Sequence, residues 1–238
     1  MGKNVRKTEG LFTLLLILPL LFALWFPQPA SISHILFIGN SITYHPAAVE
    51  QYNWHGAWGM NASAAHLDYD HQVWAGVAAR QGDVPEMGII RAVSLEDMLT
   101  TSDDIMAYEP DLLVVQWGEA APYDMPQEEW DTVYRKIKKA AGATAVVAVG
   151  MWGTHEIRDK EDKLRIAALN AGILYVPIRD LHAPRTAEMC AGLHLGVCNH
   201  PDDSEMAALA GRILAAIYGQ STYLPLVHGK GDGTVPPK

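Results

Sequence analysis

The hydrophobic and polar positions along the chain predict alternating strands and helices. Short apolar runs, bounded by turn signals, occur at 35–38, 87–93, 112–117, 144–149 and 173–178. Such runs are typical of strands that are buried on both faces of a parallel sheet. Stretches with apolar residues at helical spacing separate most of them or follow the last, at 64–79, 128–141, 161–171 and 202–218. The alternation predicts one doubly wound α/β domain over residues 34–220.

The two ends of the chain depart from this pattern. Basic residues near the start (Lys3, Arg6 and Lys7) precede an apolar run at 11–26 that carries no charge. This arrangement predicts that residues 1–33 are either a cleaved signal peptide or an uncleaved N-terminal membrane anchor. Either one would place the domain outside the cytoplasm, as a secreted, periplasmic or cell-surface protein. Residues 221–238 lose all periodicity and are expected to form a flexible tail.

The charge of the chain limits the kinds of partner that it is expected to bind. The 238-residue chain carries a formal net charge of −9, and the first 33 residues carry +2, which leaves −11 for the remainder. No basic stripe exists that could follow a phosphate backbone, so nucleic acid is not an expected partner. A membrane contact is expected only through the N-terminal segment. The length suffices for one sizeable core.

Several motif classes are absent from the sequence. It contains no G-x-x-x-x-G-K-[ST] or G-x-G-x-x-G phosphate loop, and no His-Glu-x-x-His. No Cys/His cluster has metal-ligand spacing, and the G-x-S-x-G nucleophile elbow is missing. We therefore expect no cofactor and no metal.

A serine and a histidine from opposite ends of the chain are the candidates for chemistry. Gly39-Asn40-Ser41 follows the first predicted strand, so Ser41 is expected at the carboxyl edge of the sheet, where ligand sites of open α/β folds lie. Taken alone, Ser41 is equally suited to be a helix N-cap. His200-Pro201 opens the last predicted helix, whose positive end would keep a His200 ring at the N-cap neutral. A neutral imidazole that takes the serine proton would activate it as a nucleophile.

These residues resemble the conserved blocks of the SGNH (GDSL-type) hydrolase superfamily. Gly39-Asn40-Ser41 is similar to its first block and His200-Pro201 to its last, while Gly118-Glu119-Ala120 stands at its third. The resemblance covers residues 34–220, and the sequence looks like one bacterial branch of secreted members. It implies a flavodoxin-like three-layer α/β/α sandwich, ester hydrolysis that includes acetyl groups on sugars, Ser41 as nucleophile and His200 as general base.

The chain departs from the family pattern at the oxyanion hole. Ala120 stands where the third block has Asn, so a side-chain donor is missing. The second block would supply a Gly after strand two, but the sequence reads Ala92-Val93-Ser94. The remaining candidates for oxyanion donors are the backbone N–H groups of Ser41, Ser94 and Gly118.

The orienting carboxylate is also missing. Val197 stands three residues before His200, where the family has Asp. Asp180, Asp202 or Asp203 could take over this role, although the latter two are better explained as ordinary helix-start charges. In an oxidising compartment, Cys190 and Cys198 are expected to form a disulfide that restrains the loop before His200. The alternative is two buried thiols.

Aromatic residues gather after the first block. Tyr44, Trp54 and Trp58 could form a platform for a sugar or another ligand beside the site, or they could simply be core. Two hypotheses follow. One is an extracytoplasmic serine esterase, slowed by the missing Asn and Asp, whose substrate is a small-molecule or glycan ester. The other is a catalytically silent SGNH-like domain that binds a glycan or a protein partner.

Overall fold

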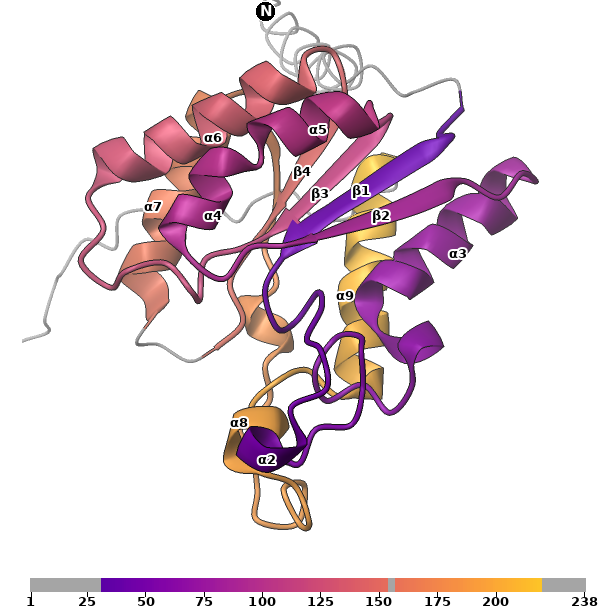
Figure 1. The fold of residues 1–238 in the computed structure, drawn as a ribbon, viewed down its shortest axis with the longest axis vertical. Coiled ribbons are helices and arrows are strands. Elements are labelled where there is room, and N and C mark those ends of the chain that lie inside the picture. The colour runs from indigo at the N-terminus through magenta and orange to yellow at the C-terminus, as the bar shows by residue number, and fades with distance from the viewer. Residues whose placement is uncertain (1–30, 154–156, 220–238) are drawn as a thin grey trace, which may run out of the picture.

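A sheet of five parallel strands forms the centre of the computed structural model, which describes residues 31–153 and 157–219 (Figure 1). The strands are β1 (His34–Gly39), β2 (Glu86–Arg91), β3 (Leu112–Gln116), β4 (Ala145–Val149) and β5 (Leu174–Val176), in the order β2-β1-β3-β4-β5. The chain leaves β1 for β2 on one side and later returns to β3 on the other. The carboxyl ends of β1 and β3 therefore flank a topological switch point, where α/β sheets bind ligands.

Helices cover both faces of the sheet. In Figure 1, α3 (Tyr69–Gln81) and α9 (Asp203–Ile217) lie on one face. The other face carries α4 (Leu95–Thr100), α5 (Ser102–Tyr108), α6 (Gln127–Ala141) and α7 (Arg158–Asn170). Alternate β1 residues enter the two cores, because Ile35 and Phe37 pack with α3 and α9 while Leu36 and Ile38 pack with the other helices. The predicted three-layer α/β/α fold is confirmed.

A small lobe lies beyond the carboxyl edge of the sheet. It holds the short helices α2 (Val49–Tyr52) and α8 (Leu195–Cys198), which lie side by side in Figure 1. The rings of Tyr52 and His194 meet with centroids 5.3 Å apart. A separate cluster of buried residues, Trp54, Met60 and Val197, forms the core of this lobe. Two segments far apart in the sequence thus build one structure next to the switch point.

The structure corrects several predicted helix boundaries. The helix expected at 64–79 is a 3₁₀ turn, η1 (Ala65–Leu67), followed by α3, because the Asp68 side chain caps α3 by accepting from the His71 N–H. The last helix begins at Asp203 with Asp202 as its N-cap. Helices α4 and α5 were not predicted. A further 3₁₀ turn, η3 (Arg179–Leu181), follows β5.

The folded domain begins slightly before the predicted residue 34. Ile32 is 2% exposed, and its N–H donates to Gln81 Oε1 at 3.1 Å. Most of the predicted signal or anchor segment and the predicted tail, 221–238, lie outside the described residues. Within the described ranges, no helix combines the length and the apolar character needed to cross a bilayer.

Candidate active site

Ser41 lies in a tight turn that directly follows β1. The Asn40 carbonyl accepts from the N–H groups of Thr43 and Tyr44 at 2.9 and 2.8 Å, and the Ser41 carbonyl accepts from Met60 N–H at 2.8 Å. The turn needs Gly39, because a Cβ there would lie 2.0 Å from Thr43 Oγ1 and 2.6 Å from the Gln116 carbonyl oxygen. The sequence Gly-Asn-Ser thus fixes Ser41 at the carboxyl edge of the sheet.

His200 approaches Ser41 from the other end of the chain. Its Nε2 lies 2.6 Å from Ser41 Oγ, within hydrogen-bond distance. The His200 N–H donates to the Val197 carbonyl at 2.9 Å, which ties the residue to the end of α8. His200 lies three residues before α9, not at its N-cap as predicted, because Asp202 caps that helix.

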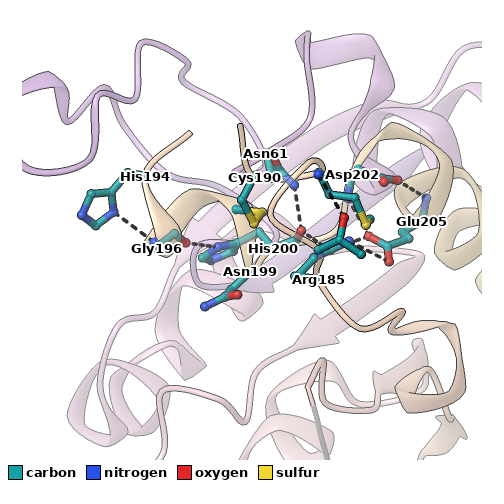
Figure 2. Close-up of a disulfide and its surroundings, with 12 residues drawn as sticks. Asn61, Arg185, Cys190, His194, Gly196, Asn199, His200, Asp202 and Glu205 are labelled. Atoms are coloured by element: carbon teal, nitrogen blue, oxygen red, sulfur yellow. Dashed lines mark hydrogen bonds and ion pairs between the residues drawn. A yellow bond between two sulfur atoms is a disulfide. The ribbon is translucent and has the colours of Figure 1, made fainter. Parts of the chain in front are cut away.

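A backbone carbonyl sets the tautomer of His200. Nδ1 lies 2.6 Å from the carbonyl oxygen of Gly196, which can only accept (Figure 2). Nδ1 therefore carries the proton, and Nε2 is left to accept the proton of Ser41 Oγ. Burial lowers the pKa of His200 to about 4, so the ring is neutral at pH 7. The predicted neutral state thus arises from burial and not from the end of a helix.

None of the three candidate aspartates orients the His200 ring. Asp180 pairs with Arg212, with Oδ2 and Nη2 2.9 Å apart. Asp202 accepts from the backbone of α9 as its cap, and Asp203 accepts from the Ser63 N–H and Oγ, both at 2.7 Å. The prediction that one of these aspartates orients the ring is therefore wrong, and the Gly196 carbonyl accepts from His200 Nδ1 instead.

The peptide of His200 is held as well as its ring. The His200 carbonyl oxygen accepts from Arg185 Nη2 at 2.5 Å and from Asn61 Nδ2 at 2.8 Å (Figure 2). A disulfide joins Cys190 to Cys198, with the Cα atoms 5.4 Å apart. It closes the loop that carries the Gly196 carbonyl, so the expected bridge lies next to the base.

A cavity of about 320 Å³ opens at the Ser41–His200 pair. Residues from the ends of β1, β3 and β4 line it together with residues that precede α9. They are Asn40, Ser41, Ile42, Gln116, Glu119, Ala120, Trp152, Asn199 and His200. Most of these side chains are polar, which suits a polar ligand held by hydrogen bonds.

Two of the cavity residues, Glu119 and Trp152, were missed as candidates. Glu119 accepts from the Trp152 N–H and from Gln116 Nε2, and burial raises the pKa of its carboxyl. Trp152 Nε1 donates to the Asn199 carbonyl at 3.0 Å, which ties β4 to the segment before His200. Both residues follow the carboxyl ends of predicted strands, and that position was the available signal.

The structure does not gather all three predicted oxyanion donors. Among the described residues, no hydrogen bond occupies the Ser41 N–H, which lies at the cavity. The Ser94 N–H donates to Asp97 Oδ2 at 2.9 Å in the capping box of α4, so it is already used. Gly118 packs against Met151 and does not line the cavity. Ala120 does line the cavity and offers no side-chain donor.

The predicted aromatic platform is not formed. Trp54 is 8% exposed in the core of the lobe, where its ring meets Trp58 at a centroid distance of 5.6 Å. Trp58 Nε1 donates to the Ala62 carbonyl at 2.7 Å, and Tyr44 does not line the cavity. The rings of Trp54 and Trp58 pack in the lobe, and Trp152 is the tryptophan that lines the cavity.

One cluster in the described part of the chain could offer ligand atoms to a metal. Asp68, Asp70 and His71 place one such atom each within 4.8 Å of one another. His71 Nδ1 lies 2.7 Å from Asp68 Oδ1 and 3.3 Å from Asp70 Oδ1. Because Asp68 also accepts from Gly59 N–H and caps α3, these contacts account for the cluster as a buried ion pair.

Comparisons with known proteins agree with this architecture. No family model matches the sequence, and no curated protein matches it significantly. Among solved structures, LAE5, an alpha/beta hydrolase enzyme from the metagenome of Lake Arreo, superposes with a TM-score of 0.55 at 15% identity. The match covers 81% of this chain and 98% of that one.

Two further structures resemble the chain to a similar degree. A protein described as a GDSL-like lipase from Parabacteroides merdae gives a TM-score of 0.56 at 17% identity, over 79% of this chain and 96% of that one. The acetylxylan esterase Axe2 from Geobacillus stearothermophilus gives 0.56 at 14%, over 80% and 96%. Variants of Axe2 that are described as catalytic mutants replace a serine and a histidine. The chain therefore has the fold of the SGNH-like (GDSL-type) hydrolase superfamily.

Proposed function

We propose that the protein is a serine esterase in which Ser41 is the nucleophile and His200 the general base. The observation that carries this proposal is the 2.6 Å contact between Ser41 Oγ and His200 Nε2 in the wall of the cavity. The SGNH fold and the esterase neighbours support it, since Axe2 is described as an acetylxylan esterase.

The chemistry follows from the protonation of His200. Nε2 takes the Ser41 proton while Oγ attacks the ester carbonyl, and the same proton then goes to the departing alcohol. Water attacks the acyl-Ser41 ester and gives one proton to His200, which passes it to Ser41 Oγ as the acyl–Oγ bond breaks and the carboxylic acid leaves. The Ser41 N–H is the donor available for the negative carbonyl oxygen, and Ala120 adds none. We therefore infer a slow enzyme.

The cavity suggests the substrate class. Its lining of amide, carboxyl and imidazole groups favours an ester whose alcohol part carries hydroxyl groups, such as an acetylated carbohydrate. The extracytoplasmic location also belongs to the proposal. The Cys190–Cys198 disulfide supports it, because such bonds persist in oxidising compartments.

Labelling with a fluorophosphonate tests the proposal directly, because the reagent reacts only with an activated serine. We expect the full chain to be labelled at one site, and Ser41→Ala to abolish the label. Ser204→Ala is the matched control, since this exposed serine in the first turn of α9 does not line the cavity. A folded protein that neither takes up the reagent nor hydrolyses acetyl esters would favour the silent binding domain, which the missing donor at Ala120 supports.

A further inference from the structure

An ion pair lies next to the backbone of His200. The guanidinium of Arg185 binds the Glu205 carboxylate through two contacts, Nη1 to Oε1 at 3.1 Å and Nη2 to Oε2 at 2.6 Å (Figure 2). The two side chains are only 8% and 10% exposed. Two parallel contacts of this kind fix the plane of the guanidinium as well as its position.

The ion pair is itself anchored to α9 and to Trp152, which lines the cavity. Glu205 belongs to the first turn of α9, where Oε2 also accepts from the Asp202 N–H at 2.9 Å in the capping box. The Arg185 guanidinium lies over the Trp152 ring, 5.8 Å from its centroid. Arg185 therefore connects the helix that follows His200 with the tryptophan that lines the cavity.

The same guanidinium reaches the peptide of His200. Nη2 donates to the His200 carbonyl oxygen, which Asn61 Nδ2 also contacts. A hydrogen bond from a charged donor is roughly twice as strong as a neutral one. The described residues place no carboxylate on His200 Nδ1, so the ring is held by the Gly196 carbonyl and by the position of its own backbone.

We propose that Arg185 is a positioning residue that, together with Glu205, performs the orienting task of the missing triad aspartate by fixing the backbone of His200. This inference rests on the proposed esterase function. The Arg185–Glu205 ion pair thereby keeps His200 Nε2 within hydrogen-bond distance of Ser41 Oγ. The arrangement differs from an aspartate in charge, because Glu205 is neutralised by Arg185 and gives the protonated ring little support.

The charge of Arg185 acts on the pKa of the His200 ring, and this pKa can be measured. A purely structural role of Arg185 would leave it unchanged. The groups that face His200 are His45 from the turn after β1, Arg185, and Glu205 behind Arg185. Burial is the main reason for the low pKa of His200, and the positive charge of Arg185 lowers it further. Removing that charge should therefore raise the pKa of the ring.

The test compares Arg185→Met with Arg185→Lys in the full chain. For Arg185→Met we expect kcat on an acetyl ester to fall about 10- to 100-fold with little change in KM, as for the loss of one charged hydrogen bond. The acid limb of the kcat/KM profile should move to higher pH. Arg185→Lys keeps the charge but loses the planar fork, so kcat should fall while the limb stays in place.

Arg212→Met is the matched control. Arg212 lies on α9, as Glu205 does, and like Arg185 it pairs with a carboxylate, that of Asp180, but it does not contact His200. This variant should lose stability without losing kcat or moving the limb. Unchanged kinetics in a folded Arg185→Met variant would overturn the proposal. So would an equal kcat loss in Arg212→Met at matched stability.

A titration of the His200 ring by NMR makes the test independent of activity and of esterase function. We expect the ring of the parent to titrate at low pH and that of Arg185→Met at higher pH. If the parent takes up no fluorophosphonate but the titration moves, the esterase proposal fails while the placement of Arg185 on His200 stands. A titration that is identical in the two proteins refutes the placement. If Arg185→Met does not fold, Arg185→Lys and the profile of kcat decide.

Discussion

Reduction of the Cys190–Cys198 disulfide should slow the proposed esterase without unfolding the sheet. The bridge spans a sequence separation of 8 residues, and the Gly196 carbonyl that holds His200 Nδ1 lies inside this loop. In the chain-entropy model, closing a loop of this length stabilises it by about 2.5 kcal/mol. Opening it therefore releases the acceptor that sets the tautomer of the base.

The size of the effect lies between two limits. Loss of one ordinary hydrogen bond, about 1 kcal/mol, corresponds to roughly a 5-fold lower rate. If ordering Gly196 in the opened loop costs the full free energy of loop closure, about 2.5 kcal/mol, the rate falls roughly 70-fold. We expect kcat/KM to fall within this range, while the far-UV circular dichroism of the sheet and its helices stays unchanged.

The assay follows hydrolysis of a small acetyl ester and the rate of fluorophosphonate labelling, before and after treatment with a phosphine reductant. The double variant Cys190→Ala/Cys198→Ala is the control, because it should be slow from the start and indifferent to reductant. Thiol titration of the denatured, unreduced protein should find no free cysteine. A reduced protein with the full rate would refute the reasoning, as would a rate loss that only accompanies melting of the sheet.

Three further predictions concern the oxyanion, the base and the buried ion cluster. Ala120→Asn restores a donor and should raise turnover on a small acetyl ester by about 10²–10³-fold; a folded variant with the parent's turnover would contradict this. Because burial lowers the pKa of His200 to about 4, kcat/KM should be lost only below about pH 4; an acid limb near the ordinary histidine pKa of about 6.5 would show that the ring is solvated. Burial raises the pKa of Asp70 to about 8, and the bond to Asp68 raises that of His71 to about 10. Both groups bind protons more tightly when folded, so this stability is complete below their unfolded pKa values and is lost as pH rises through 8 and 10. Urea unfolding at pH 6 and pH 9 should therefore show lower stability at pH 9, with a smaller difference in Asp70→Asn; a parent that is more stable at pH 9 would exclude the assignment.

The meeting of Ser41 and His200 could be predicted because it follows from topology. In a parallel sheet the carboxyl ends of the strands share one edge, so a serine after strand one is brought to that edge. The final His-Pro pair lies before a helix that packs on the same sheet. Strand and helix periodicity predicts this topology, and the topology brings the two residues to the same edge of the sheet.

The partner of His200 Nδ1 could not be predicted in the same way. A backbone carbonyl such as that of Gly196 has no side-chain signature, so a search for a substitute aspartate could not find it. The roles of Trp54 and Trp152 were equally hidden, because periodicity does not say which ring packs inward and which faces a cavity. Short-range detail of this kind depends on tertiary packing.

Ser41 and His200 are 159 residues apart, so the ribosome makes one long before the other. During synthesis the N-terminal part emerges first, so Ser41 is made long before the segment that carries its base. Helix α9 helps to hold the segment that carries His200, since Glu205 of that helix binds Arg185 and Arg185 binds the His200 peptide. A nascent or C-terminally truncated chain therefore has a serine but no reactive nucleophile. For the proposed esterase, hydrolysis therefore requires the chain through α9.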